Sequence, residues 1–229
     1  YDEGPEVVYG IGQEQHPVDR KKLNTVNHFF VNKAIIELAL FKTSEQSEQD
    51  ALQIFWSEVD HLRDLFKFEF FYAPTEDFHQ QIRNEMSRYS PDWEELLGQG
   101  PAGFAAMLNH MTPLVAHVTL LTYTEAYSVV ASMLARKEPY ESLEQNQCVD
   151  EALTYGRQAY LQRRISSESS IGKLLFKNGY KMLQSRNLTE GGADSMKTER
   201  LELARELREL LRRIDVIRAI GVANRNAAP

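Results

Sequence analysis

Apolar residues recur at every third or fourth position along most of this chain, which is the spacing of amphipathic helices. The pattern predicts helices over residues 23–41, 51–66 and 75–88, the last two beginning at Ser47–Asp50 and Thr75. Further helices are predicted over residues 91–98, 142–164, from Ser166 or Ser167 to 182, and over 198–220. The fold class is therefore expected to be mainly α, a helical bundle.

One segment has a different pattern. Residues 6–12, EVVYGIG, form a short β-branched and aromatic run, which predicts one short N-terminal strand. Gly10 and Gly12 spell G-x-G, but Gln15 stands where a dinucleotide fingerprint needs its third glycine. A Rossmann fold is therefore not expected.

We divide the chain into four segments. Residues 1–16 are expected to be a strand and linker continuing an upstream domain, since the chain opens on Tyr1 and shows no signal peptide. Residues 17–188 form the helical region, and 189–197 a polar linker with two glycines. Residues 198–229 are predicted to be a terminal amphipathic helix with a frayed tail.

Residues 96–124 contain no Asp, Glu, Lys or Arg, which raises the question of a membrane span. Glycines, prolines and histidines interrupt the stretch, and the most apolar window, 114–134, contains Glu125. A buried helix is the better interpretation, with membrane contact as the alternative.

Composition and charge narrow the function. Hydrophobic residues make up 42% of the 229 residues and charged residues 26%, values of a folded protein. The net charge of -7 argues against nucleic acid as a partner. The single cysteine, Cys148, excludes an intrachain disulfide and a cysteine zinc cluster, and favours a reducing compartment. We predict no metal site and no cofactor, and the chain contains no H-E-x-x-H, P-loop, G-x-S-x-G or EF-hand motif.

A candidate anion site lies in the most basic part of the chain. Residues 148–186 contain seven basic and three acidic residues. There, Arg163 and Arg164 precede a predicted helix N-terminus at Ser166 and Ser167, where guanidinium, hydroxyl and amide donors suit a phosphate or carboxylate. The alternative is that the arginines stabilise the carbonyls that end the preceding helix, or pair with acids elsewhere.

An aromatic run, KFEFFY, follows the second predicted helix. Phe68, Phe70 and Phe71 in this run are candidates for a surface that faces lipid or an acyl chain. Packing into the core is the alternative interpretation.

Three phrases in the chain are distinctive: LNTVNHFFVNKAIIELAL (23–40), LRDLFKFEFFYAPTEDF (62–78) and YGRQAYLQRRISSESSIGKLLF (155–176). In this order they resemble the C-terminal region of bacterial glycerol-3-phosphate acyltransferases of the PlsB type, over about residues 7–186. The resemblance implies an enzyme that transfers an acyl group from acyl-CoA or acyl carrier protein to the 1-hydroxyl of glycerol 3-phosphate. It also implies a peripheral position at the cytoplasmic face of the inner membrane.

The catalytic motif of that family is H-x-x-x-x-D, and this chain departs from it. None of the six histidines is followed by aspartate at the fifth position. The resemblance therefore assigns no catalytic residue here, and implies a non-catalytic C-terminal domain with an upstream catalytic domain as partner. The alternative is a self-standing helical scaffold or a membrane-surface module that binds an anionic ligand.

Overall fold

The structure, a computed structural model, describes the backbone of residues 17–46 and 50–227 and the side chains of residues 30–46 and 50–224. Every regular element in this part of the chain is a helix, which confirms the mainly α prediction. The strand predicted at residues 6–12 lies outside the described residues. The elements are α1 (Pro17–Glu45), α2 (Ala51–Leu65), α3 (Thr75–Tyr89), α4 (Trp93–Gly98), α5 (Pro101–His110), α6 (Ala116–Thr119), α7 (Leu121–Leu134), α8 (Gln145–Leu161), a 3-10 turn η1 (Glu168–Ser170), α9 (Lys173–Ser185) and α10 (Ser195–Ala227).

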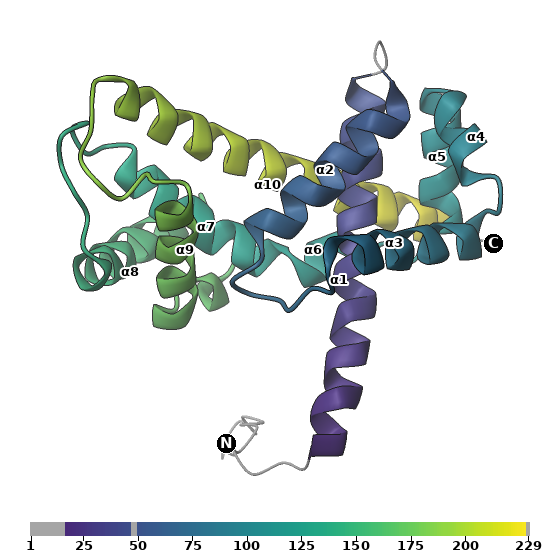
Figure 1. Cartoon of the computed structure of the whole chain (residues 1–229), viewed down its shortest axis with the longest axis horizontal. Helices are drawn as coiled ribbons and strands as arrows, with labels where there is room; N and C mark the ends of the chain where they lie inside the picture. Colours follow the sequence, from purple (N-terminus) through teal and green to yellow (C-terminus); the bar gives the residue numbers. More distant parts are fainter. Residues whose placement is uncertain (1–16, 47–49, 228–229) are drawn as a thin grey trace.

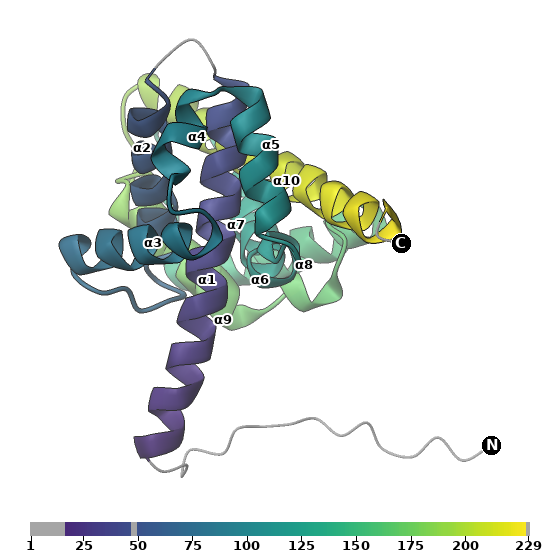
Figure 2. The same cartoon turned by 90° about the vertical axis from the view of Figure 1, so that its right-hand side faces the viewer.

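The long helix α10 joins the two sides of the molecule. It starts on the side occupied by α7, α8 and α9, crosses α1, and ends near α5 (Figure 1). Helices α2 to α5 gather around the second half of α1 (Figure 2). Because α10 packs along α7 and also contacts α1 and α6, it is part of one shared core.

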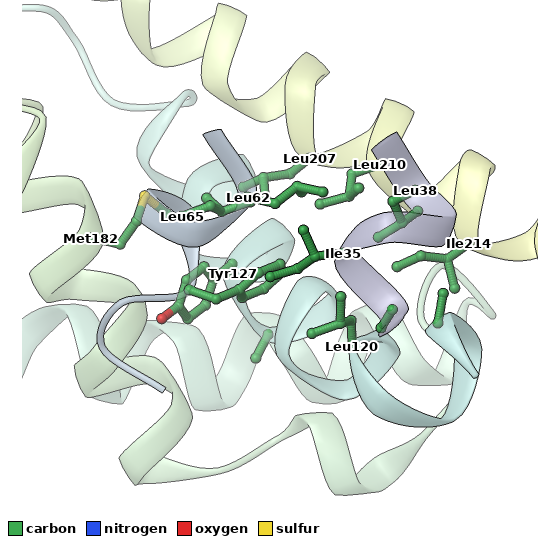
Figure 3. Close-up of a cluster of buried hydrophobic side chains, with 14 of the residues drawn as sticks. Ile35, Leu38, Leu62, Leu65, Leu120, Tyr127, Met182, Leu207, Leu210 and Ile214 are labelled. Atoms are coloured by element: carbon green, nitrogen blue, oxygen red, sulfur yellow. The ribbon is translucent and has the colours of Figure 1, made fainter. Parts of the chain in front are cut away.

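The core is built from helices that are far apart in sequence. Side chains from α1, α2, α7, α9 and α10 meet in one cluster, including Ile35, Leu62, Tyr127, Met182 and Leu207 (Figure 3). The apolar window 114–134 is buried as predicted, since ten of the 14 residues of α7 are buried, but it forms two helices, α6 and α7, rather than one. Within the described residues, none of the helices is long and apolar enough to cross a membrane.

Several predicted boundaries are wrong. Helix α10 begins at Ser195, inside the expected linker, and stays helical to Ala227, into the expected frayed tail. Ser142 does not cap α8: its hydroxyl accepts a hydrogen bond from the amide of Gly191 at 3.0 Å, and α8 begins only at Gln145. The segment after α9 is thus packed against the segment before α8, which local patterning does not reveal. The start of α2 was placed more accurately, since Asp50 caps it through the amides of residues 52 and 53.

Arg200 of α10 holds these two segments together. Its side chain is 1% exposed and donates to four backbone carbonyls. Two of them belong to the segment before α8, Glu138 at 2.9 Å and Glu141 at 2.8 Å. The others follow α9, Leu188 at 3.1 Å and Glu190 at 3.0 Å. Because a planar guanidinium offers five donors in a fixed arrangement, one side chain can join two loops to a helix.

Glu37 of α1 is a second buried charge that links distant segments. Its carboxylate accepts hydrogen bonds from the amides of Val115 at 2.9 Å and Ala116 at 2.8 Å, where the short helix α6 begins. Burial raises the pKa of Glu37 to about 7, although the two amides and nearby Lys33 act in the opposite direction. Glu37 therefore fixes the start of α6 against the middle of α1.

Candidate functional site

Ser166, one of the two serines predicted to bind an anion, is hydrogen-bonded to a carboxylate inside the protein. The carboxylate of Glu125, on α7, accepts hydrogen bonds from the Ser166 amide at 2.5 Å and the Ser166 hydroxyl at 2.7 Å. Its other oxygen accepts from the Ser170 hydroxyl at 2.5 Å. Ser167 accepts a hydrogen bond from the amide of Ser169 and caps η1. The carboxylate of Glu125 thus occupies the donors of Ser166 that were predicted to bind an anionic ligand, and Ser167 contacts Ser169 instead.

The predicted helix start at Ser166 or Ser167 is also wrong. Only the 3-10 turn η1 begins there, and α9 starts at Lys173, after Gly172. The contacts of Glu125 with Ser166 and Ser170 hold this segment against α7, so it does not continue as one helix. Leu174, in the first turn of α9, is 71% exposed.

Arg163 and Arg164 end helix α8 through their backbone. The amide of Arg164 donates to the carbonyl of Ala159 at 2.8 Å, and the amide of Arg163 to that of Tyr160 at 2.9 Å. Arg163 has a φ of 57°, in the left-handed region. These are the two bonds of a Schellman motif, with arginine at the position that usually holds glycine. The carbonyls that end α8 are therefore satisfied by amides, and both guanidinium groups are available for other contacts.

We expect Arg163→Gly to increase the free energy of unfolding by about 1 kcal/mol, because glycine adopts the left-handed conformation without a clash at Cβ. Urea unfolding followed by circular dichroism measures the change. Arg157→Gly is the matched control: Arg157 is exposed inside α8, and glycine there should cost about 1 kcal/mol. If both variants lose stability equally, the left-handed cap is not present in solution.

The side chain of Arg164 lines a cavity of about 420 Å³ between α7, α8 and α10. Arg163 and Ser166 lie instead in a separate hollow beside the end of α8, so the structure does not bring the four predicted residues together. The polar lining of the larger cavity consists of Ser128, Ser132, Arg136, Tyr155, Arg164 and Arg208, and its apolar lining includes Val129, Ile165, Leu201 and Leu211.

Tyr155 organises two of the three arginines in this cavity. The guanidinium carbons of Arg136 and Arg164 lie 4.7 Å and 4.9 Å from the centre of its ring, as cation-π pairs. Arg164 also donates to the Tyr155 hydroxyl at 2.7 Å and to the side chain of Gln162 at 2.9 Å. The resulting site places fixed positive charge and hydroxyl groups beside an apolar wall.

The aromatic run is split between the core and solvent. Phe68 and Phe70 are partly buried against the core, and the Phe70 ring lies 5.0 Å from that of Tyr123 on α7. Phe71 is 85% exposed. Glu69, between Phe68 and Phe70 in the sequence, accepts a hydrogen bond from Asn178 of α9 at 3.1 Å, and burial raises the pKa of Glu69. The run thus fastens the loop after α2 to α7 and α9 and presents one phenyl ring to solvent.

Two histidines pair with carboxylates that are distant in sequence. His79 on α3 lies 2.6 Å from Asp60 on α2, and its ring lies 4.7 Å from that of Trp56. His61 lies 3.1 Å from Glu206; although burial would raise the pKa of Glu206, hydrogen bonds from His61 and Arg186 hold it below its usual value. Among the described residues, no three histidine, cysteine or acidic side chains are grouped as a metal site would require.

Comparison with known proteins tests the resemblance directly. The family described as "Glycerol-3-phosphate acyltransferase C-terminal region" matches residues 1–191. The chain belongs to this family. The match ends just before α10, although α10 contributes to the core of the fold.

Longer relatives of this acyltransferase region agree with the family match. Proteins of Mycobacterium tuberculosis and Mycobacterium bovis named "Putative acyltransferase plsB1" are 32% identical over 220 residues, which cover 95% of this chain. The same residues cover 35% of each relative, so the chain spans about a third of their length. No solved structure matches the chain.

One residue of the cavity in this acyltransferase region could be predicted from the sequence. Arg164 was predicted as an anion-binding residue and does line it, whereas Arg136 and Arg208 were missed. Arg136 lies in the turn after α7, and Arg208 lies in the middle of α10. No motif joins residues so far apart, and only the packing of α10 and α8 against α7 places them around one cavity.

Proposed function

We propose that this chain is the non-catalytic C-terminal domain of a glycerol-3-phosphate acyltransferase. In this role it supports the transfer of an acyl group from acyl-CoA or acyl carrier protein to the 1-hydroxyl of glycerol 3-phosphate. The observation that carries the proposal is the match to the C-terminal region of this family in a chain that spans about a third of its longer relatives. The remaining length of those relatives has room for a catalytic domain.

The first part of α1 is the surface that we propose for contact with the upstream catalytic domain. In both views the backbone at the start of α1 extends away from the other helices drawn (Figures 1 and 2). The sequence of this part has Leu23, Val26 and Phe29 at intervals of three residues. Apolar positions at helical spacing on a protruding helix are typical of a segment that packs on a partner.

A double variant, Leu23→Glu with Val26→Glu, tests this contact. We expect it to lose co-purification with the catalytic H-x-x-x-x-D domain, because two charges would have to be buried at the contact. The thermal midpoint of the chain should stay unchanged, since the other helices pack on the later part of α1. Asn24→Glu, on the same helix, is the control and should still co-purify. Equal co-purification of the double variant and the wild type would exclude this surface.

The same proposal places the domain peripherally at the cytoplasmic face of the inner membrane. Phe71 supports it, because a largely exposed phenyl ring beside a helix bundle is suited to insertion at a lipid surface. Fractionation of cells that produce the whole acyltransferase measures the location. Recovery of the protein in the fraction without membranes would contradict this part of the proposal.

A further inference from the structure

We infer that the cavity between α7, α8 and α10 binds a phosphate monoester attached to an apolar group. Three guanidinium groups, those of Arg136, Arg164 and Arg208, line this single cavity of about 420 Å³. They come from three separate parts of the chain that the fold brings together. This inference does not depend on the proposed function, because the site lies wholly within this chain.

Arg136 and Tyr155 also border a neighbouring hollow with four acidic residues, Glu138, Glu141, Asp150 and Glu151, but the charged residues that line the cavity itself are all arginines. No acidic side chain lines it, and within the described residues none of its three arginines forms an ion pair with a carboxylate. Elsewhere on α10 and next to it, arginines do pair: Arg186 lies 2.9 Å from Glu206, and Arg213 lies 3.0 Å from Glu45. In a chain with a net charge of -7, three arginines without a carboxylate partner around one cavity favour an anionic ligand.

The donor groups suit phosphate in particular. Guanidinium groups bind phosphate oxygens through two parallel hydrogen bonds, and a monoester has three such oxygens. The hydroxyls of Ser128, Ser132 and Tyr155 add donors to the same lining. Arg164 is already oriented by its hydrogen bonds to Tyr155 and Gln162, which reduces the entropy lost on binding.

The rest of the lining specifies an amphipathic ligand. Val129, Ile165, Leu201 and Leu211 form an apolar wall in the same cavity. The volume lies within the range of small-molecule sites, and it exceeds what a phosphate group alone would fill. A phosphate ester with a short chain or ring therefore fits, either as a soluble metabolite or as the headgroup of a lipid.

Calorimetric titration of the 229-residue chain with hexyl phosphate tests the inference. We expect binding that weakens about tenfold or more in Arg136→Gln and in Arg208→Gln, since each removes a charged hydrogen-bond donor. Arg205→Gln is the matched control, an exposed arginine one turn away on α10 and outside the cavity, and should bind as the wild type does. Circular dichroism of each variant verifies that it is folded.

Three results would overturn the inference. They are no binding of hexyl phosphate, an equal loss of affinity in the Arg205 and Arg208 variants, and binding of hexanol as tight as that of hexyl phosphate. Flotation with phosphatidylcholine vesicles containing phosphatidic acid then distinguishes the sources. Flotation that depends on Arg208 assigns the site to a lipid headgroup, and hexyl phosphate binding without flotation assigns it to a soluble phosphate ester.

Discussion

Replacing Arg200 by alanine should lower the free energy of unfolding by about 3–5 kcal/mol, the largest effect that we expect of a single substitution in this chain. The variant leaves the carbonyls of Glu138, Glu141, Leu188 and Glu190 without this donor, and it opens a cavity in a fully packed region. Each buried acceptor that loses its partner costs free energy, and the loops before α8 and after α9 lose their common anchor.

Urea unfolding followed by circular dichroism measures this change, with two further variants for comparison. Arg200→Lys should recover little of the stability, because an ammonium group cannot reach four carbonyls in a fixed plane. Arg205→Ala, at an exposed position on the same helix, should change stability by no more than about 0.5 kcal/mol. If the Arg200 and Arg205 variants unfold at the same urea concentration, Arg200 does not join the two loops.

Glu37→Ala should cost about 3 kcal/mol, because it removes the acceptor for the buried amides of Val115 and Ala116. The lost stability should be greatest at the contact between α1 and α6 and in the core next to this contact. Hydrogen exchange of the amides of residues 115 and 116 measures the local effect, and urea unfolding measures the global change in free energy. Unchanged protection of both amides in the alanine variant would contradict the assigned contact.

The raised pKa of Glu37 also predicts a dependence on pH. Folding raises this pKa from 4.5 to about 7, so the folded state holds the proton more tightly than the unfolded state does. The stabilisation from this group is therefore complete below pH 4.5 and is lost as the pH rises through 7, by roughly 3 kcal/mol in total. Glu37→Gln cannot titrate, so relative to it the wild type should lose stability across this interval. A difference between the two proteins that does not change with pH would contradict the shift.

Local patterning predicted the helices well and their ends less well. Periodicity of apolar residues placed the helical segments because each helix buries one face, and Asp50 caps α2 by a short-range contact that a sequence can show. Errors arose where a distant residue decides the outcome. Glu125 accepts hydrogen bonds from Ser166 and Ser170 and holds them against α7. The amide of Gly191 donates to the hydroxyl of Ser142, which therefore does not cap α8.

The candidate site was predicted only in part for the same reason. Arg164 stood out because it lies in a basic stretch next to a helix end, whereas Arg136 lies in the turn after α7 and Arg208 in a helix, positions where arginine is an ordinary surface residue. Their role emerges only from the packing of both α10 and α8 against α7. The buried Arg200 was missed as well, because a charged residue in a polar helix pattern predicts exposure.

The most direct test of the central claim is acyl transfer from a long-chain acyl-CoA to glycerol 3-phosphate, measured with this chain alone, with the upstream H-x-x-x-x-D domain alone, and with the two fused or mixed. We expect activity in the combined sample and none from this chain alone. Activity of the chain alone would contradict the account and would direct attention to His79, which the fold pairs with Asp60. Full activity of the upstream domain without this chain would equally contradict a supporting role.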